Sequence, residues 1–245
     1  GSHVVQQLAH LGVGRIVGID ADTAEGSNRS RLIGLTARDV QEKRPKIHVM
    51  QEMVGRIALG TVFEGVQSNV PSPDAIPALR DADVIVGCLD NYHARDDLQQ
   101  VSWRLLIPYV DIGLVIDPPT EEQRPVMDNW IGGQVYTLIP GSACLGCTDY
   151  LTDACLEAET GGGGRSYLRH GRAAQVVSLN GVLASQAVNE VLQIVTGFAQ
   201  REGGSSLRKF NGVLGTLELW RIRAKPTCAL CLSHLAAGDP VWRTA

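Results

Sequence analysis

Four of the six cysteines fall into two Cys-x-x-Cys pairs, Cys144-Leu-Gly-Cys147 and Cys228-Ala-Leu-Cys231. Each pair can place two thiolates on one tight turn, and together they supply the tetrahedral four-sulfur shell that zinc prefers. A closed shell leaves no open position for a substrate, so this zinc would be structural and would tie the C-terminal strands back to the preceding domain. Two alternatives stay open: a redox Cys-x-x-Cys, although no thioredoxin-like helix follows either pair, and reduced buried thiols.

Acidic residues follow two predicted buried strands. Asp20 ends the apolar run RIVGID, and Asp90-Asn91 follows the run ADVIVGCL. Ligands of open α/β sheets bind at the carboxyl ends of the strands, where an acid can hold ribose hydroxyls. The second acid could hold a hydrated Mg²⁺. Asp90 alone could equally cap the helix predicted after it.

Polar and cationic side chains lie between these two acids in the sequence. Asn28 and Arg31 occur in Ser-Asn-Arg-Ser-Arg-Leu, and Lys46 ends Lys-Arg-Pro-Lys. Arg31 and Lys46 could neutralise a triphosphate, whereas Lys46 alone would be interpreted as a solvated surface charge. In this order, the residues indicate a nucleotide site at the strand ends.

The elements that must position these residues alternate between helical and extended patterns. In the first half we predict helices over 4–11, 45–59 and 91–106, and strands over 15–20, 61–66, 82–89 and 108–116. In the second half we predict a strand over 130–140, a polar, mobile, Gly-rich loop over 148–172, a buried helix over 174–198, and a strand pair over 207–223 that turns at Asn211-Gly212. This order predicts a Rossmann-like α/β fold, with an open, mostly parallel sheet, covering helices and a C-terminal antiparallel extension.

Such a domain should begin with a strand and a Gly-rich loop before the helix at 4–11, and we expect both to be missing here. Gly1-Ser2-His3 is either a cloning scar or the end of that loop. Of the two remaining cysteines, Cys88 is expected in the core and Cys155 in an exposed loop.

Bulk composition narrows the class of protein. The 245 residues suffice for one large domain or two small ones, and 44% of them are hydrophobic, as in an ordinary globular core. A net charge of −4 and an aromatic content of 5% argue against nucleic acid as a partner. No apolar run approaches the roughly 20 residues that span a bilayer. With metal binding favoured over disulfides for the cysteines, we expect a cytoplasmic protein with no membrane association.

The order Asp20, Asn28-x-x-Arg31, Arg-Pro-Lys46, Asp90-Asn91 and the two cysteine pairs closely resembles the ThiF/MoeB/HesA family, which are bacterial relatives of the ubiquitin-activating enzymes. The resemblance covers essentially the whole chain. It implies ATP-dependent adenylation of the C-terminal glycine carboxylate of a ubiquitin-like or sulfur-carrier protein, with release of pyrophosphate. The sequence departs from the family pattern at Leu32, where glutamine usually follows the arginine.

The resemblance also implies roles for individual residues. Asp20 would hold the ribose, Asn28 and Arg31 would contact phosphates, Lys46 would bind the triphosphate, and the Asp90 carboxylate would hold Mg²⁺, with Asn91 beside it. Some members carry a catalytic cysteine in a crossover loop, so Cys155 would be either a thioester- or persulfide-forming residue or an incidental cysteine.

The same resemblance implies a single adenylation domain over 1–245. Its nucleotide-binding half would cover 1–120, and its zinc-stapled half 121–245, with a crossover loop at about 148–172. Members of the family commonly form twofold dimers, so a homodimer is expected.

Two other functions remain possible from the sequence. In an NAD-dependent oxidoreductase, Asp20 would suit the nicotinamide cofactor's ribose, but no acid for hydride chemistry stands out and the cysteine pairs have no role. In a non-catalytic binding module, the same fold would only dock a partner.

Overall fold

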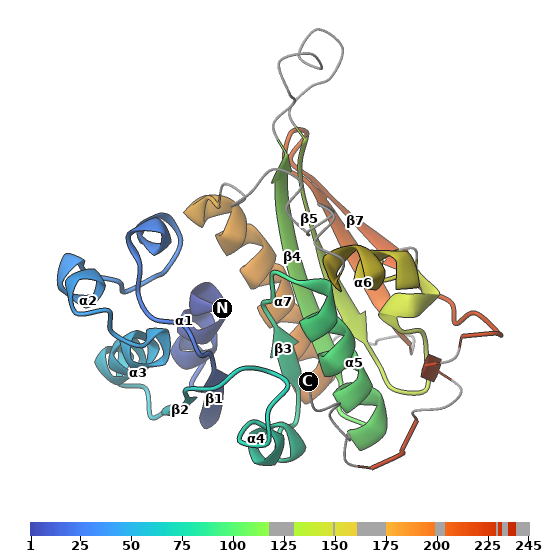
Figure 1. The fold of residues 1–245 in the computed structure, drawn as a ribbon, viewed down its shortest axis with the longest axis horizontal. Coiled ribbons are helices and arrows are strands. Elements are labelled where there is room, and N and C mark those ends of the chain that lie inside the picture. Colours follow the sequence, from blue (N-terminus) through green and yellow to red (C-terminus); the bar gives the residue numbers. More distant parts are fainter. Residues whose placement is uncertain are drawn as a thin grey trace, which may run out of the picture.

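The computed structural model describes residues 1–117, 130–148, 150–160, 175–198, 204–228, 230–231 and 235–238. The N-terminal part contains two strands, a 3-10 helix and three α-helices, all placed together at one end of the molecule (Figure 1). They are α1 (Ser2–His10), β1 (Arg15–Ile19), η1 (Gly26–Ser30), α2 (Ala37–Gln41), α3 (Lys46–Ile57) and β2 (Val62–Val66).

The rest of the described chain builds a larger sheet and the helices on its two faces (Figure 1). These elements are α4 (Ile76–Arg80), β3 (Ile85–Gly87), α5 (Tyr92–Leu105), β4 (Tyr109–Asp117), β5 (Trp130–Leu138), η2 (Leu145–Cys147), α6 (Asp153–Thr160), α7 (Val177–Thr196), β6 (Ser206–Asn211) and β7 (Thr216–Arg221).

Two hydrogen-bonded sheets are present in the described residues. β1 and β2 form a parallel pair, and the second sheet has the order β3-β4-β5-β6-β7. Within it, β3 and β4 are parallel, whereas the pairs from β4 to β7 are antiparallel. The predicted Rossmann-like α/β class with a C-terminal antiparallel extension is confirmed. The expectation of a mostly parallel sheet is wrong for the larger sheet, which is mixed: only its β3–β4 pair is parallel, because the antiparallel part already begins at the β4–β5 pair.

Two hydrophobic cores fill the two faces of the larger sheet. On one face, α7 packs with α1 and α3 against Val110, Leu114 and Val135. Gly133 of β5 permits this close approach, because a Cβ there would lie 2.4 Å from a methyl carbon of Leu183. On the other face, α5 packs against β3, β4 and β5, and this second core includes the first cysteine pair. The first core joins β1 and β2 to the larger sheet.

Most predicted elements are present, with bounds that shift by a few residues. The strand predicted over 82–89 is reduced to β3, because only three of its residues pair with β4. The turn predicted at Asn211-Gly212 is present but longer: Asn211 still pairs with Thr216, so residues 212–215 form a four-residue turn. The Asn211 side chain supports this turn by accepting hydrogen bonds from Val213 N and Leu214 N, both at 3.0 Å.

The loop predicted over 148–172 is wrong for residues 153–160, which form α6. The helix begins after Thr152, whose hydroxyl accepts a hydrogen bond from Cys155 N at 3.3 Å, as an N-cap does. Ala, Leu and Glu then favour helix within this short polar stretch. Residues 161–172, which complete the predicted loop, lie outside the described residues.

Within the part of the chain that the structure describes, no helix has both the length and the apolar character needed to cross a bilayer.

Candidate functional site

The two cysteine pairs meet in one cluster. The four sulfur atoms of Cys144, Cys147, Cys228 and Cys231 all lie within 4.8 Å of one another. The Cys144–Cys228, Cys147–Cys231 and Cys144–Cys147 sulfur separations are 3.4, 3.5 and 3.8 Å. Sulfurs at the corners of a tetrahedron with Zn–S bonds of about 2.3 Å lie about 3.8 Å apart, whereas a disulfide needs about 2.05 Å. The predicted cluster is confirmed, and its geometry suits zinc.

The surroundings of the four thiols also fit a cation. Burial, followed by contact with Cys231 and Cys228, raises the pKa of the Cys144 thiol far above its usual value. Burial opposes ionisation of Cys147 as well, but the Lys225 N–H, which donates to its sulfur at 3.3 Å, helps to lower its pKa. Four thiolates cannot share so small a buried volume without a metal, and a divalent cation would displace their protons. The donor set therefore fits zinc.

The cysteine cluster is attached to α5 through a buried glutamine. Gln99 is 2% exposed, and its Oε1 accepts a hydrogen bond from Leu145 N, inside the first cysteine turn, at 3.0 Å. Gln99 was not identified from the sequence, because a lone glutamine on a helix carries no signal of such a contact. The four-cysteine cluster is thus anchored to α5, the helix that Asn91 caps.

Asp20 and Lys46 come together at the end of β1. The Asp20 carboxylate accepts a hydrogen bond from Asp22 N at 2.8 Å. The Lys46 ammonium contacts Asp22 Oδ2 at 2.5 Å, and the Lys46 backbone N–H donates to Asp22 O at 3.0 Å. Burial raises the pKa of Asp20, while the Asp22 N–H and Lys46 act in the opposite direction. Asp22 was missed in the sequence, although its spacing in Asp20-Ala-Asp22 was visible.

Asn28 has a structural role, because its side chain caps a turn. It is 4% exposed, and its side-chain oxygen accepts a hydrogen bond from Glu25 N at 2.9 Å, which closes a capping box at the start of η1. Arg31 follows η1, and its guanidinium donates to Ser27 O at 3.3 Å. Asn28 therefore shapes the turn that presents Arg31.

The amino end of α1 lies between the Arg31 segment and the end of β3. Ser2 Oγ donates to Arg31 O at 3.4 Å and accepts from Ile33 N at 3.0 Å. On the other side, a Cβ on Gly1 would lie 3.9 Å from Cβ of Cys88. A helix amino end carries unpaired N–H groups and a partial positive charge, so it attracts anions. The Arg31 backbone and Cys88 thus flank a helix end whose partial charge would attract an anion.

Asp90 and Asn91, which follow the end of β3 by three and four residues, have different roles. Asp90 is exposed, whereas Asn91 is the N-cap of α5, and its Oδ1 accepts a hydrogen bond from Ala94 N at 2.7 Å. Because Asn91 caps the helix, Asp90 is not needed for that purpose. The carboxylate of Asp90 is therefore presented to solvent at the strand end.

Helix α6 docks on the amino end of α5, beside Asp90-Asn91 (Figure 1). Glu159 Oε2 accepts hydrogen bonds from Tyr92 N at 2.9 Å and His93 N at 3.0 Å, and His93 Nε2 contacts Thr160 Oγ1 at 2.9 Å. The carboxylate is stabilised there by the partial positive charge of the helix end. Glu159 was not identified from the sequence, because the contact joins residues that are 67 positions apart.

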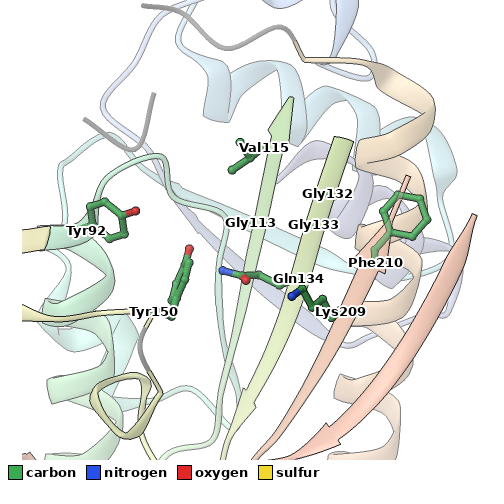
Figure 2. A pocket seen from close by; sticks show the side chains of 9 residues that line it. All are labelled: Tyr92, Gly113, Val115, Gly132, Gly133, Gln134, Tyr150, Lys209 and Phe210. Atoms are coloured by element: carbon green, nitrogen blue, oxygen red, sulfur yellow. The ribbon is translucent and has the colours of Figure 1, made fainter. Parts of the chain in front are cut away.

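A small pocket lies between α5, the segment after the first cysteine pair, and strands β4 to β6 (Figure 2). Two tyrosine rings lie on one side, and polar side chains rise from β5 and β6 on the other. Its volume of about 120 Å³ is well below the roughly 300 Å³ at which sites for whole small molecules begin, so it suits a narrow extended chain. It is lined by Tyr92, Gly113, Val115, Gly132, Gly133, Gln134, Tyr150, Lys209 and Phe210.

Polar groups and glycines meet at the centre of this pocket. Gly113, Gln134 and Lys209 occupy one row across β4, β5 and β6, and the Gln134 amide points toward the Tyr150 ring (Figure 2). Glycine lets a bound backbone approach the sheet closely, while an amide and an ammonium can bind carbonyl or carboxylate oxygens. This pocket was not predicted from the sequence.

The expected settings of the two other cysteines are wrong. Cys88 is exposed, because β3 ends at Gly87 and the residue after it leaves the buried strand. Cys155 is half-buried on α6, where its sulfur accepts a hydrogen bond from the Thr152 hydroxyl at 3.2 Å. Neither forms a disulfide, and neither belongs to the four-cysteine cluster.

The structure thus combines a Rossmann-like α/β fold, polar residues after two strands and a four-cysteine cluster whose geometry suits zinc. The profile of the ThiF family matches residues 1–230, and the chain belongs to this family. The family resemblance in the sequence is confirmed.

Individual relatives are similar along most of this chain. The chain is 26% identical over 250 residues to ubiquitin-like modifier-activating enzyme 5 of Dictyostelium discoideum, which covers 96% of this chain and 60% of that relative. It is 26% identical over 242 residues to the sulfur carrier protein ThiS adenylyltransferase of Escherichia coli, with 98% and 84% covered. The chain spans between 48% and 60% of the length of the modifier-activating enzymes it matches.

A solved structure confirms the fold. E. coli MccB with ATP superposes with a TM-score of 0.71 at 18% identity, covering 94% of this chain and 63% of that chain.

Proposed function

We propose that this protein uses ATP to adenylate the C-terminal carboxylate of a ubiquitin-like or sulfur-carrier protein and releases pyrophosphate. The observation that carries the proposal is the assembly around the amino end of α1, where Ser2 contacts the Arg31 backbone and Gly1 lies beside Cys88, two residues before Asp90. Family membership supports it, since the E. coli relative is named an adenylyltransferase of the sulfur carrier ThiS.

Each residue of this assembly suits one part of ATP. Asp20, which follows β1, would accept hydrogen bonds from ribose hydroxyls. Arg31 and Lys46 would neutralise the phosphates, and Lys46 would exchange its contact with the exposed Asp22 for the phosphate contact. Asn28 would take part in phosphate binding mainly through the turn that it caps.

Asp90 is the carboxylate best placed to hold a hydrated Mg²⁺, because oxygen ligands suit this ion and Asn91 already caps the helix. Bound Mg²⁺ would supply charge neutralisation on the phosphate oxygens. In the reaction, a carboxylate oxygen of the substrate forms a bond to the α-phosphorus of ATP. The bond from that phosphorus to the bridging oxygen breaks, and pyrophosphate leaves with its electron pair. The nucleophile is already ionised, so positioning and charge neutralisation are the main requirements.

The pocket beside α5 would receive the extended C-terminal tail of the carrier protein. It begins at Tyr92, two residues after Asp90, and its glycines Gly113 and Gly132 leave room for a glycine-ended backbone. The folded part of the carrier would dock on the apolar side chains of the β6–β7 hairpin, where Leu214 is 72% and Leu219 is 52% exposed. Large exposed apolar groups on an edge strand are typical of an interaction surface.

The zinc cluster would be structural, since four sulfurs leave no open coordination position. Among the described residues, the hydrogen bonds of the Cys155 sulfur go to the Thr152 hydroxyl and the Tyr150 carbonyl, neither of which is a base, so a thioester or persulfide role stays a prediction. A homodimer and a cytoplasmic location are further parts of this proposal.

ATP–pyrophosphate exchange tests the proposal. Purified protein would be assayed with ubiquitin-like and sulfur-carrier proteins that end in glycine, and with matched carriers that lack the final glycine. We expect exchange only with intact carriers, and none for Asp90→Ala with its fold retained. Exchange that is unchanged in Asp90→Ala would refute the role of this residue. NAD binding tighter than ATP would favour the oxidoreductase alternative, and ATP binding without any exchange would favour the non-catalytic module.

A further inference from the structure

A fully buried arginine lies one turn after Asn91. Arg95 of α5 and Asp111 of β4 are both 0% exposed, and Arg95 Nη1 donates to Asp111 Oδ2. The other carboxylate oxygen accepts a hydrogen bond from the Tyr109 hydroxyl at 2.7 Å. Burying two charges costs desolvation that their attraction often fails to recover, so such a pair is weak evidence for stability. The other contacts of the Arg95 guanidinium indicate a more specific role than stability.

The second arm of the guanidinium holds the strand end that carries Asp90. Arg95 Nη2 donates to Leu89 O and, at 3.2 Å, to Ile112 O. Leu89 directly precedes Asp90, so this hydrogen bond fixes the backbone that leads from β3 to Asp90. The guanidinium carbon also lies 5.7 Å from the centre of the Tyr150 ring, which lines the pocket. One buried side chain thus contacts the Asp90 segment, β4 and the pocket wall.

We propose that Arg95 is a positioning residue for adenylation, which directs the Asp90 carboxylate into the nucleotide site by holding the Leu89 carbonyl. Because Arg95 is fully buried, it acts through Asp90 and makes no contact with ATP. This inference rests on the proposed function in taking Asp90 as the Mg²⁺-binding acid.

Arg95→Lys is the informative substitution. Lysine keeps the positive charge opposite Asp111, but a single ammonium lacks the planar fork that reaches Asp111, Leu89 and Ile112 together. The chain also offers a matched control. Arg208 contacts Glu190 at 2.5 Å, and Glu190 is 1% exposed and accepts a hydrogen bond from the Thr137 hydroxyl at 2.7 Å. Arg208→Lys therefore perturbs a similar ion pair on the opposite face of the sheet.

Calorimetric titration of ATP, with and without Mg²⁺, measures the role directly. In wild-type protein Mg²⁺ should tighten ATP binding, and Asp90→Asn should remove this gain. We expect Arg95→Lys to remove most of this Mg²⁺-dependent gain in ATP affinity, and to change the affinity no further when Asp90→Asn is already present. Arg95→Lys should also lower the exchange rate roughly 100-fold, as a misplacement of about 1 Å can do. Arg208→Lys should stay within about twofold of wild type in both assays.

Equal Mg²⁺ effects in Arg95→Lys and Arg208→Lys, or a full additional loss in the Asp90→Asn background, would overturn the proposal. Circular dichroism and thermal unfolding check that each variant folds. If Arg95→Lys does not fold, Tyr109→Phe is the alternative, because it removes only the hydroxyl that orients Asp111. This variant should lose part of the Mg²⁺-dependent gain in ATP affinity, but less of it than Arg95→Lys would. No such effect in Tyr109→Phe would then count against the proposal. Wild-type protein that binds Mg²⁺ and ATP but exchanges no pyrophosphate would refute the adenylation function while leaving the binding test of Arg95 valid.

Discussion

Replacing Cys228 by serine should remove the zinc ion and a large part of the folding stability. Cys228 and Cys144 are separated by 84 positions in the sequence, while their sulfur atoms lie 3.4 Å apart. A metal bound to both closes this long loop. For a cross-link over 84 residues, the chain-entropy relation gives a stabilisation of about 4.6 kcal/mol at 25 °C, a value that residual structure in the unfolded chain would reduce.

The assay combines metal analysis with urea denaturation. Wild-type protein should contain one zinc ion per chain, and Cys228→Ser should contain none and unfold at a clearly lower urea concentration. Cys88→Ser is the matched control, because Cys88 is exposed and lies outside the cluster; its stability should stay within about 0.5 kcal/mol of wild type. Wild-type protein purified without zinc, or a Cys228→Ser variant with an unchanged denaturation midpoint, would refute the reasoning.

Three further substitutions test other parts of the structure. Burial, and then Asp96, raises the pKa of Asp97 to about 6. The folded state therefore binds the proton of the Asp97 carboxyl more tightly than the unfolded state does, and the stabilisation from this bound proton is lost as pH rises through about 6. In urea denaturation, Asp97→Asn should reduce this loss of stability and should stabilise the protein at pH 7 by up to about 1 kcal/mol. Leu219→Asp should weaken carrier binding at least tenfold by calorimetry with little effect on stability, since Leu219 is half exposed. Lys46→Met should raise the apparent KM for ATP at least tenfold, yet change stability by less than about 1 kcal/mol, because its partner Asp22 is 70% exposed.

Each of these expectations has a clear contrary result. A wild-type pH dependence in Asp97→Asn would show that another group titrates. Thr216→Asp, on the other face of the same strand, is the control for Leu219→Asp, and equal effects of the two would refute a docking face. An unchanged KM in Lys46→Met would exclude its phosphate contact.

The sequence sufficed to predict the strand ends and the four-cysteine cluster. Both depend on local patterns: an acid after an apolar run marks the end of a buried strand, and a Cys-x-x-Cys turn places two sulfurs side by side whatever its context. Asp20 and Asp90 were therefore predicted at strand ends; Asp20 directly follows β1, and Asp90 lies three residues after the end of β3.

Contacts between distant segments could not be predicted in this way. The apolar run before Asp90 gave no indication that only three of its residues would pair with β4, so Cys88 was placed in the core although it is exposed. Helix α6 is stabilised by Glu159 at the amino end of α5, a contact over 67 positions that its short polar sequence does not reveal. Arg95 resembles any surface arginine in sequence, and only the positions of Asp111 and Leu89 show that it is buried and paired.

The central claim is that a carrier carboxylate becomes bonded to AMP. Intact-mass spectrometry of a glycine-ended carrier after incubation with the protein, ATP and Mg²⁺ tests it most directly. The structure predicts an AMP adduct on the C-terminal carboxylate with wild-type protein and none with Asp90→Asn. A wild-type protein that binds ATP but leaves every carrier unmodified, or an equal adduct with Asp90→Asn, would contradict the claim.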